Sequence, residues 1–236
     1  MIWVWDYVTN DQYNLAPYPN VQNIGPNMEF LASIGVVGHY ADMTANRGHD
    51  MAHLKLYLLG RKGLDPSLND TSLVTEFTDG FFGTGAAVHV RSYLDIMGAA
   101  MLKSGAAAPP STDPGKDPPA AGWEHSPVFG NVSFLAAATA MSEAQAEAAK
   151  LPELAERVAV AMMPLQFIAL VRWKELVAFA QPAAWPFAST IEAEFAKFAA
   201  TVQRVGVPYI SQGARTKGRC GYHCNISQFR AQVLAG

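Results

Sequence analysis

Hydrophobic and polar residues alternate over the first positions of the chain, which begins MIWVWDYV. A two-residue period with aromatic and β-branched side chains is typical of a β-strand, so this segment predicts a strand over residues 2–8. Alternation separates the strand into two faces, one with Ile2, Val4 and Asp6 and the other with Trp3, Trp5 and Tyr7.

The next segment has the pattern of an α/β unit. Residues 21–24 and 36–40 are short runs rich in β-branched side chains and are strand candidates. Residues 27–33 between them form a short helix candidate, which Gly35 ends. An order of strand, helix and strand with short connections indicates parallel strands joined by a crossover helix.

Helical periodicity dominates the rest of the chain. Three stripes of apolar residues recur at intervals of three and four, as on one face of an amphipathic helix. They are Val90, Tyr93, Leu94, Met97 and Met101; Leu154, Val158, Ala161, Leu165 and Ile168; and Ile191, Phe195, Phe198 and Val202. We also expect helices after Asp50 and after Asp70 or Thr71, each acting as an N-terminal cap. The later stripes suit a small antiparallel helical bundle.

These patterns divide the chain into four regions. Residues 1–103 mix strands and helices, and residues 122–203 are predicted to be helical. Residues 104–121 contain the run GAAAPPSTDPGKDPPAA, which cannot hold a regular helix or an inner strand and reads as a linker. Residues 204–236 are predicted to form an irregular tail. The predicted fold class is therefore α/β followed by all-α.

Composition narrows the possible functions. The chain has 236 residues, half of them hydrophobic, and a formal net charge of −3. That balance predicts no general attraction for nucleic acid. No uninterrupted apolar run reaches the roughly 18 residues of a membrane span. A phosphate-binding loop, a dinucleotide fingerprint and a nucleophile elbow are absent from the sequence, and we expect no cofactor.

Two histidine and cysteine patterns are candidate metal sites. His49 and His53 are four residues apart and could share a zinc ion, but the glutamate that zincins carry after the first histidine is missing. Cys220, His223 and Cys224 could bind a metal, form a disulfide or lie in a flexible tail. Neither pattern supplies a complete ligand set, so we expect no metal.

The first strand ends in a group of aromatic and polar side chains, WVWDYVTN. Indole rings stack on the apolar faces of sugars, and a nearby carboxylate and phenol can hydrogen-bond to hydroxyl groups. At the C-terminal end of a barrel strand such residues would line an active site. The alternative is that the two tryptophans fill a core, as aromatic side chains usually do.

Several segments together resemble a known family. WVWDYVTN, PYPN (17–20) and GPNMEFLASIGVVG (25–38) are similar to the family called domain of unknown function 4838, which is related to glycoside hydrolase family 163. The similarity continues through residues 50–69 and 76–97, and it is looser through residues 143–170.

The resemblance implies a (β/α)8 glycosidase barrel followed by a helical region. It implies an endo-β-N-acetylglucosaminidase acting on N-acetylglucosamine-containing glycans by retaining, substrate-assisted hydrolysis, in which the sugar's own acetamide replaces a protein nucleophile. The expected catalytic residues are Asp6 and Tyr7. The expected substrate-binding residues are Trp3, Trp5, Asn10, Asn27 and Asp42.

The resemblance covers only the last part of that barrel. We expect three barrel strands, at residues 2–8, 21–24 and 36–40, and we expect the main catalytic carboxylates of related barrels to lie on earlier strands outside this chain. Family members often read GVFEQG where residues 38–43 read GHYADM, so Ala41 replaces a glutamate unless Asp42 substitutes for it.

Two consequences follow for partners and location. Three parallel strands leave open edges, so we expect the missing N-terminal half of the barrel or a partner chain to be needed for stability. A non-catalytic remnant that binds carbohydrate or a protein partner is the alternative function. Family members are typically secreted or cell-surface proteins, but we find no signal peptide here and the sequence leaves the compartment open.

Overall fold

A computed structural model describes residues 1–10, 14–43, 48–105, 126–180, 185–210 and 224–234. Within these residues the chain is mostly helical and contains a small parallel sheet. The elements are β1 (Ile2–Tyr7), α1 (Val21–Ser33), β2 (Val36–Asp42), α2 (Ala52–Leu64), α3 (Asp70–Phe82), α4 (Thr84–Ser104), the 3₁₀ turn η2 (Pro127–Phe129), α5 (Asn131–Ala148), α6 (Pro152–Val171), α7 (Trp173–Phe179), α8 (Ile191–Val205) and α9 (Ile226–Leu234).

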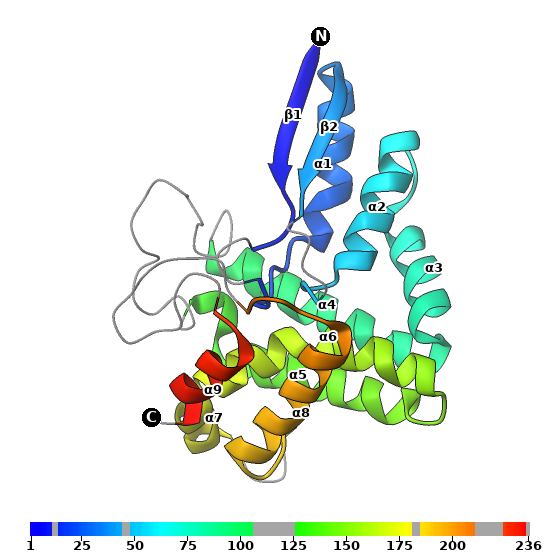
Figure 1. Ribbon diagram of the computed structural model, residues 1–236. Coiled ribbons are helices and arrows are strands. Elements are labelled where there is room, and N and C mark those ends of the chain that lie inside the picture. The colour runs from blue at the N-terminus through cyan, green and yellow to red at the C-terminus, as the bar shows by residue number, and fades with distance from the viewer. Residues whose placement is uncertain (11–13, 44–47, 106–125, 181–184, 211–223, 235–236) are drawn as a thin grey trace.

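The molecule has a helical body and a narrow projection. Figure 1 shows β1, β2 and α1 rising together from the body, with the N-terminus at the tip and α5 to α9 at the opposite end. The two strands run parallel, and Trp3 and Trp5 pair in register with Gly38 and Tyr40. The strands expected near residues 2–8 and 36–40 are thus confirmed, as is the α/β unit followed by helices.

The strand expected at residues 21–24 is wrong, because these residues form the first turn of α1. Val21, Ile24 and Met28 are buried and are spaced three and four residues apart, so they form one helical face. A short run of β-branched residues fits either a strand or a helix, and the packing of this face against α2 decides for the helix. The described residues therefore contain two parallel strands instead of three.

One hydrophobic core joins the regions on either side of the predicted linker. It includes residues from α1 to α9, and the stripe from Val90 to Met101 is buried as expected. The most extensive contact between two helices is between α4 and α5, which come from opposite sides of the linker. Residues 106–125, which contain most of that linker, lie outside the described residues. The α/β unit and the helical region are thus packed as one structural unit.

Details at helix ends differ from the sequence expectation. Asn69, one residue before the expected cap, accepts a hydrogen bond from Ser72 N at 2.9 Å and begins α3. Asp50 does not cap α2, which begins after Met51. The tail predicted to be irregular contains α9, whose Phe229 is buried beside Phe198 of α8. A helix forms there because burying this ring stabilises it.

Among the described residues, α6 is the one helix that is both long enough and apolar enough to cross a membrane. By length and composition Pro152–Val171 passes that test, but 61% of its most apolar window is buried inside the molecule. Packing in the core therefore accounts for the apolar composition of α6. That composition is only weak evidence for a membrane span.

Candidate functional site

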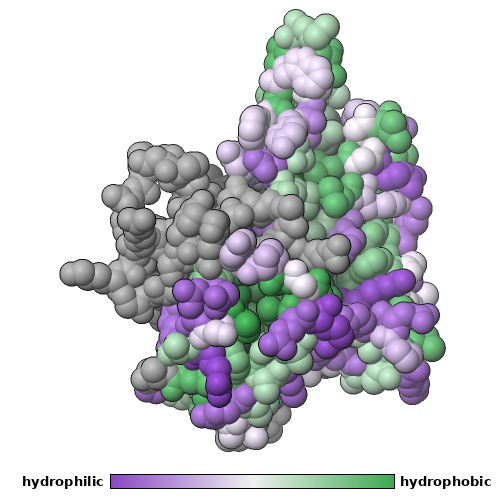
Figure 2. Space-filling view, in the orientation of Figure 1, coloured by the Kyte–Doolittle hydropathy of each residue, from purple (hydrophilic) through white to green (hydrophobic). Residues whose placement is uncertain are grey.

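The parallel strands expose a row of aromatic side chains on one face. We call Trp3, Trp5, Tyr7 and Tyr40 the aromatic face. Trp3 and Trp5 are 69% and 64% exposed, and Tyr7 and Tyr40 are also exposed. In the space-filling view (Figure 2) the tip of the projection shows apolar and near-neutral surface with little strongly hydrophilic area. An exposed aromatic group of this kind is a feature of interaction surfaces.

The rings on this face are arranged in contact. The ring centroids of Trp5 and Tyr40 are 4.8 Å apart, and those of Trp5 and Tyr7 are 6.5 Å apart. Gly38 makes room for Trp3, because a Cβ at Gly38 would lie 2.2 Å from Cε3 of the indole. Strand alternation from Gly38 and Tyr40 places Asp42 on this same face, at the C-terminal end of β2 beside Tyr7. The face therefore joins flat aromatic rings with one carboxylate.

The opposite face of the sheet borders a polar pocket of about 150 Å³ that α1 closes. Asp6 and His39 come from the two strands, and their nearest side-chain oxygen and nitrogen are 3.6 Å apart. The loop before α1 and α1 itself supply amides and apolar side chains. These lining residues include Tyr18, Asn20, Asn23, Asn27, Met28 and Leu31.

Two buried polar atoms in this pocket have no hydrogen-bond partner among the described residues. They are Nε2 of His39 and Oδ1 of Asn20, whereas Nδ2 of Asn20 donates to the carbonyl of Val8 at 3.3 Å. A buried polar group without a partner costs free energy, so such atoms are suited to binding a polar group that enters the pocket. Asp6 and His39 together can accept or donate a proton at that point.

A buried ionic network fixes the loop that shapes the polar pocket. The backbone N–H of Tyr18 donates to Asp50 at 2.9 Å, and Nζ of Lys55 donates to the carbonyl of Tyr18 at 2.8 Å. Lys55 also lies 3.6 Å from Asp50, and the hydroxyl of Tyr93 donates to Asp50 at 2.7 Å. Burial lowers the pKa of Lys55, and the neighbouring Asp50 opposes that shift. Burial and the Asp50 charge raise the pKa of Tyr93 well above its ordinary value.

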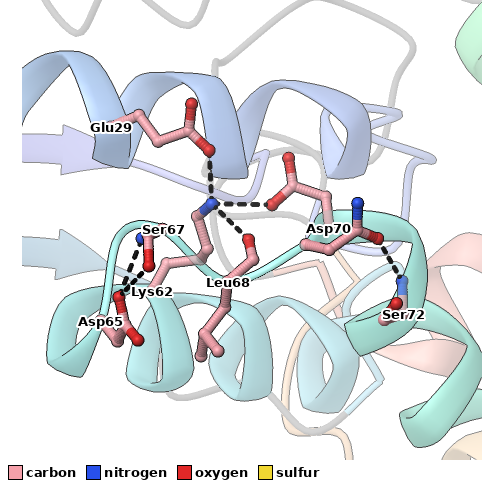
Figure 3. Close-up of polar contacts among 8 residues, drawn as sticks. Glu29, Lys62, Asp65, Ser67, Leu68, Asp70 and Ser72 are labelled. Carbon is pink, nitrogen blue, oxygen red and sulfur yellow. Dashed lines mark hydrogen bonds and ion pairs between the residues drawn. The ribbon is translucent and has the colours of Figure 1, made fainter.

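A second buried lysine holds α1 against α2 and α3. Figure 3 shows Lys62 between Glu29 and Asp70, with Nζ 2.6 Å from Glu29 and 3.0 Å from Asp70. Nζ also donates to the carbonyl of Leu68 at 2.8 Å. Burial by itself lowers the pKa of Lys62, but the bonds to Glu29 and Asp70 outweigh it and the pKa is raised. Gly25 on α1 allows this approach, since a Cβ there would lie 2.0 Å from the Asp70 carboxylate.

Both faces of the sheet and both lysine networks fall in one segment that is related to known sequences. Residues 1–95 match the model of a family described as domain of unknown function, DUF4838. This part of the chain is similar to the DUF4838 family. The family resemblance of the opening segments is thereby confirmed. No curated protein and no solved structure matches the chain.

Within the segment that matches DUF4838, the predicted site residues fall on two different faces of the sheet. Asp6, Tyr7 and Asn27 line the polar pocket, with Tyr7 at the end of β1 where the two faces meet. Trp3 and Trp5 lie on the aromatic face, and alternation places Asp42 with them. Asn10 is buried beyond the end of β1 and does not line the polar pocket.

Four residues that sequence reasoning did not select also belong to these surfaces. Tyr40 and His39 could have been selected by pairing the predicted strand over residues 36–40 in parallel with the first strand. Alternation along that strand then places Tyr40 on one face and His39 on the other. Asn20 and Asn23, with Asn27, have helical spacing. Residues 21–24 are helical in the structure. A helix predicted there would have placed these three amides on one helical face.

The structure describes only one of the two candidate metal sites, the pair His49 and His53. His49 is buried before α2 begins, while His53 is exposed on α2, so they do not share one helix face. The part of the chain that the structure describes contains no group of three or more histidine, cysteine, aspartate or glutamate side chains able to hold a metal. Cys224 is buried and disulfide-bonded, and Cys220 and His223 lie outside the described residues.

Proposed function

We propose that this chain is part of a glycoside hydrolase that acts on N-acetylglucosamine-containing glycans, and that the aromatic face binds the sugar. The observation that carries the proposal is the exposure of Trp3, Trp5 and Tyr40 on the face opposite α1, with the Trp5 and Tyr40 rings in contact and Trp3 packed over Gly38. Flat, exposed aromatic rings supply large contact area to a sugar ring at little cost in side-chain entropy.

The geometry of barrels supports this choice of face. In a (β/α)8 barrel the crossover helices lie outside, and the active site lies at the C-terminal ends of the strands. Helix α1 covers the face of β1 and β2 that carries Asp6 and His39. The aromatic face therefore corresponds to the inner face, and Tyr7 and Asp42 correspond to its catalytic end.

This arrangement suggests distinct roles for the carboxylates. Asp42 lies on the same face as the aromatic rings, where it can orient the acetamide or donate a proton to the leaving oxygen of a substrate-assisted reaction. Asp6 faces α1 and lies beside His39, so we propose that it orients neighbouring groups and does not touch the sugar. Carboxylates of earlier strands, supplied by the missing half of the barrel or a partner chain, would complete the reaction.

Glycan release from a complex N-glycoprotein, by this chain supplied with the rest of the barrel, tests the proposal. We expect Trp5→Ala to weaken binding of the glycan about tenfold or more, in line with the loss of one well-packed aromatic contact. We expect Asp42→Asn to keep binding but to abolish release. Phe30→Ala, which removes an exposed ring on α1, is the matched control and should bind like wild type.

The possible results separate the two candidate functions. Binding that depends on Trp5, with no release by wild type, would favour a non-catalytic protein that binds carbohydrate through the same exposed rings. Release that is equal in wild type, Trp5→Ala and Asp42→Asn would remove the aromatic face from the mechanism. Wild-type protein that neither binds nor releases glycan would contradict both functions.

A further inference from the structure

A second cavity lies in the helical body, away from the sheet. We call it the aromatic pocket; it has a volume of about 100 Å³ and lies between α2, α3 and α6. Its lining is mostly apolar, and the few polar groups are His49, His53, Glu156 and Arg157. Apolar walls with a few convergent polar groups are typical of sites for small ligands.

Stacked rings form one wall of this pocket. The ring centroid of Phe81 lies 5.0 Å from that of Phe77 and 5.3 Å from that of His53, and both pairs are stacked. Phe82 is buried and meets Phe81 edge-on at 5.0 Å. A flat apolar group can therefore pack against this wall.

Arg157 places a positive charge at the same wall. Its guanidinium carbon lies 4.7 Å from the Phe81 ring centroid, and Nη1 donates to the carbonyl of Phe81 at 2.8 Å. No carboxylate among the described residues pairs with it. The adjacent Glu156 is held by Arg204, whose Nε and Nη2 lie 2.7 to 2.9 Å from its oxygens. The remaining donors of Arg157 are thus free to bind an anion.

The backbone and a buried histidine add independent signs of a functional site. Met51, which lines the pocket, has φ 50° and ψ 32°, and it is the one residue other than glycine with positive φ in the described ranges. Such a conformation costs free energy and clusters at ligand sites. Burial, reinforced by the charge of Lys55 and opposed by Asp50, lowers the pKa of His49 to about 4, so this histidine is neutral at pH 7.

We propose that the aromatic pocket binds a small organic anion, a carboxylate carried on an aromatic or branched apolar body. The apolar body would pack against Phe81 and between Val160 and Leu54, which line the pocket. The carboxylate would accept hydrogen bonds from Arg157, which is partly exposed and so lies where the pocket meets solvent. The cavity of about 100 Å³ is smaller than an engineered cavity of about 150 Å³ that holds benzene in another protein, so it can take one ring at most, with the carboxylate outside at the mouth.

Benzoate is the probe that tests this inference, with benzyl alcohol as its neutral counterpart. Titration calorimetry on the full chain should show saturable benzoate binding that weakens about tenfold or more in Arg157→Gln. The matched control is Arg61→Gln, because Arg61 also lies over a ring, 5.4 Å from the Tyr57 centroid, but does not line the pocket. This control should bind benzoate like wild type, and benzyl alcohol should bind all three proteins equally weakly.

A second measurement keeps the test independent of the fold of the variants. Magnetisation transfer from benzoate ring protons to Phe81 and Val160 of the wild-type protein should be observed by NMR. Three results would overturn the inference: no saturable binding of benzoate to wild type, equal binding to wild type and Arg157→Gln, or transfer to residues outside the pocket. None of these results bears on the glycan proposal, which concerns the exposed aromatic face of the sheet and shares no lining residue with this pocket.

Discussion

The indole of Trp5 lies with its ring centroid 4.8 Å from that of Tyr40, its neighbour across the parallel pair, while the next residue, Asp6, lies on the other face beside His39. Adjacent residues of one strand thus serve two different surfaces. In the barrel that the glycan proposal invokes, the aromatic side would be the inner side and the polar side would lie beneath a crossover helix.

Adding a methyl group at Gly38 should displace Trp3. A Cβ at Gly38 would lie 2.2 Å from the indole, so Gly38→Ala should push the ring off the sheet and change tryptophan fluorescence and glycan affinity. Because Trp3 is exposed and free to move, we expect a stability loss of less than about 1 kcal/mol. Gly60→Ala on α2, where a Cβ meets nothing within 4 Å, is the control. Unchanged fluorescence in Gly38→Ala would contradict the predicted contact.

The exposed aromatic face should make the isolated chain self-associate. Two parallel strands with open edges and exposed tryptophans are a template for association. We therefore expect the double variant Trp3→Thr and Trp5→Thr, which retains strand-forming residues, to be more monomeric than wild type in analytical ultracentrifugation. Val132→Thr, at an exposed apolar position on α5, should behave like wild type. A wild-type chain that is already a monomer with a sharp, reversible melt would refute this expectation.

Removing one partner of the Asp50 and Lys55 pair should be strongly destabilising. Asp50→Asn leaves the ammonium group of Lys55 buried without its carboxylate, and we expect a loss of about 3–5 kcal/mol in the free energy of unfolding. Combining it with Lys55→Met should cost less than the sum of the single changes, as urea unfolding in a double-mutant cycle would measure.

An exposed ion pair provides the comparison for this cycle. Arg61 and Glu76 lie 3.1 Å apart on the surface, so Glu76→Gln should cost no more than about 1 kcal/mol. Strictly additive losses for Asp50→Asn and Lys55→Met would show that the two buried groups are not coupled.

His49 should make the protein less stable in mild acid. Its pKa is about 4 in the folded chain and 6.5 in the unfolded chain, so between these values the unfolded state binds the extra proton. The free energy of unfolding therefore falls as pH drops from about 6.5 to 4, by at most about 3 kcal/mol. Below about pH 4 His49 is protonated in both states and contributes no further pH dependence. His49→Gln should flatten this slope when urea midpoints are compared at pH 7 and pH 4.5. Equal slopes in both proteins would exclude His49 as the source.

Much of the local structure could be predicted from patterns within one element. Backbone geometry alone fixes which side chains of an element share a face, with a period of 2.0 residues in a strand and 3.6 in a helix. The alternation over residues 2–8 and the stripe from Val90 to Met101 could therefore be interpreted directly from the sequence. The strand at residues 36–40 and the helices over residues 152–171 and 191–205 follow for the same reason. The error at residues 21–24 arose because a run of four residues is too short to distinguish a two-residue period from a helical period of 3.6.

The candidate sites could be predicted only in part. Trp3, Trp5 and Tyr7 stand out because three aromatic side chains share one face of a strand. His39 could not be placed beside Asp6, since that contact depends on the register of two strands separated by α1. The aromatic pocket gave no signal in sequence, because Phe81 and Arg157 are 76 residues apart.

The sequence by itself determined the amphipathic elements and the family of the N-terminal segment, since both reside in short-range patterns of residue type. Only the tertiary structure decided that α1 is helical from Val21, that the regions before and after the linker share one core, and that Asp6 turns away from Trp5 toward His39. These outcomes depend on which surfaces are buried against each other. Burial is a property of residues brought together from distant parts of the chain, and its free energy outweighs the small local preferences that a sequence pattern records.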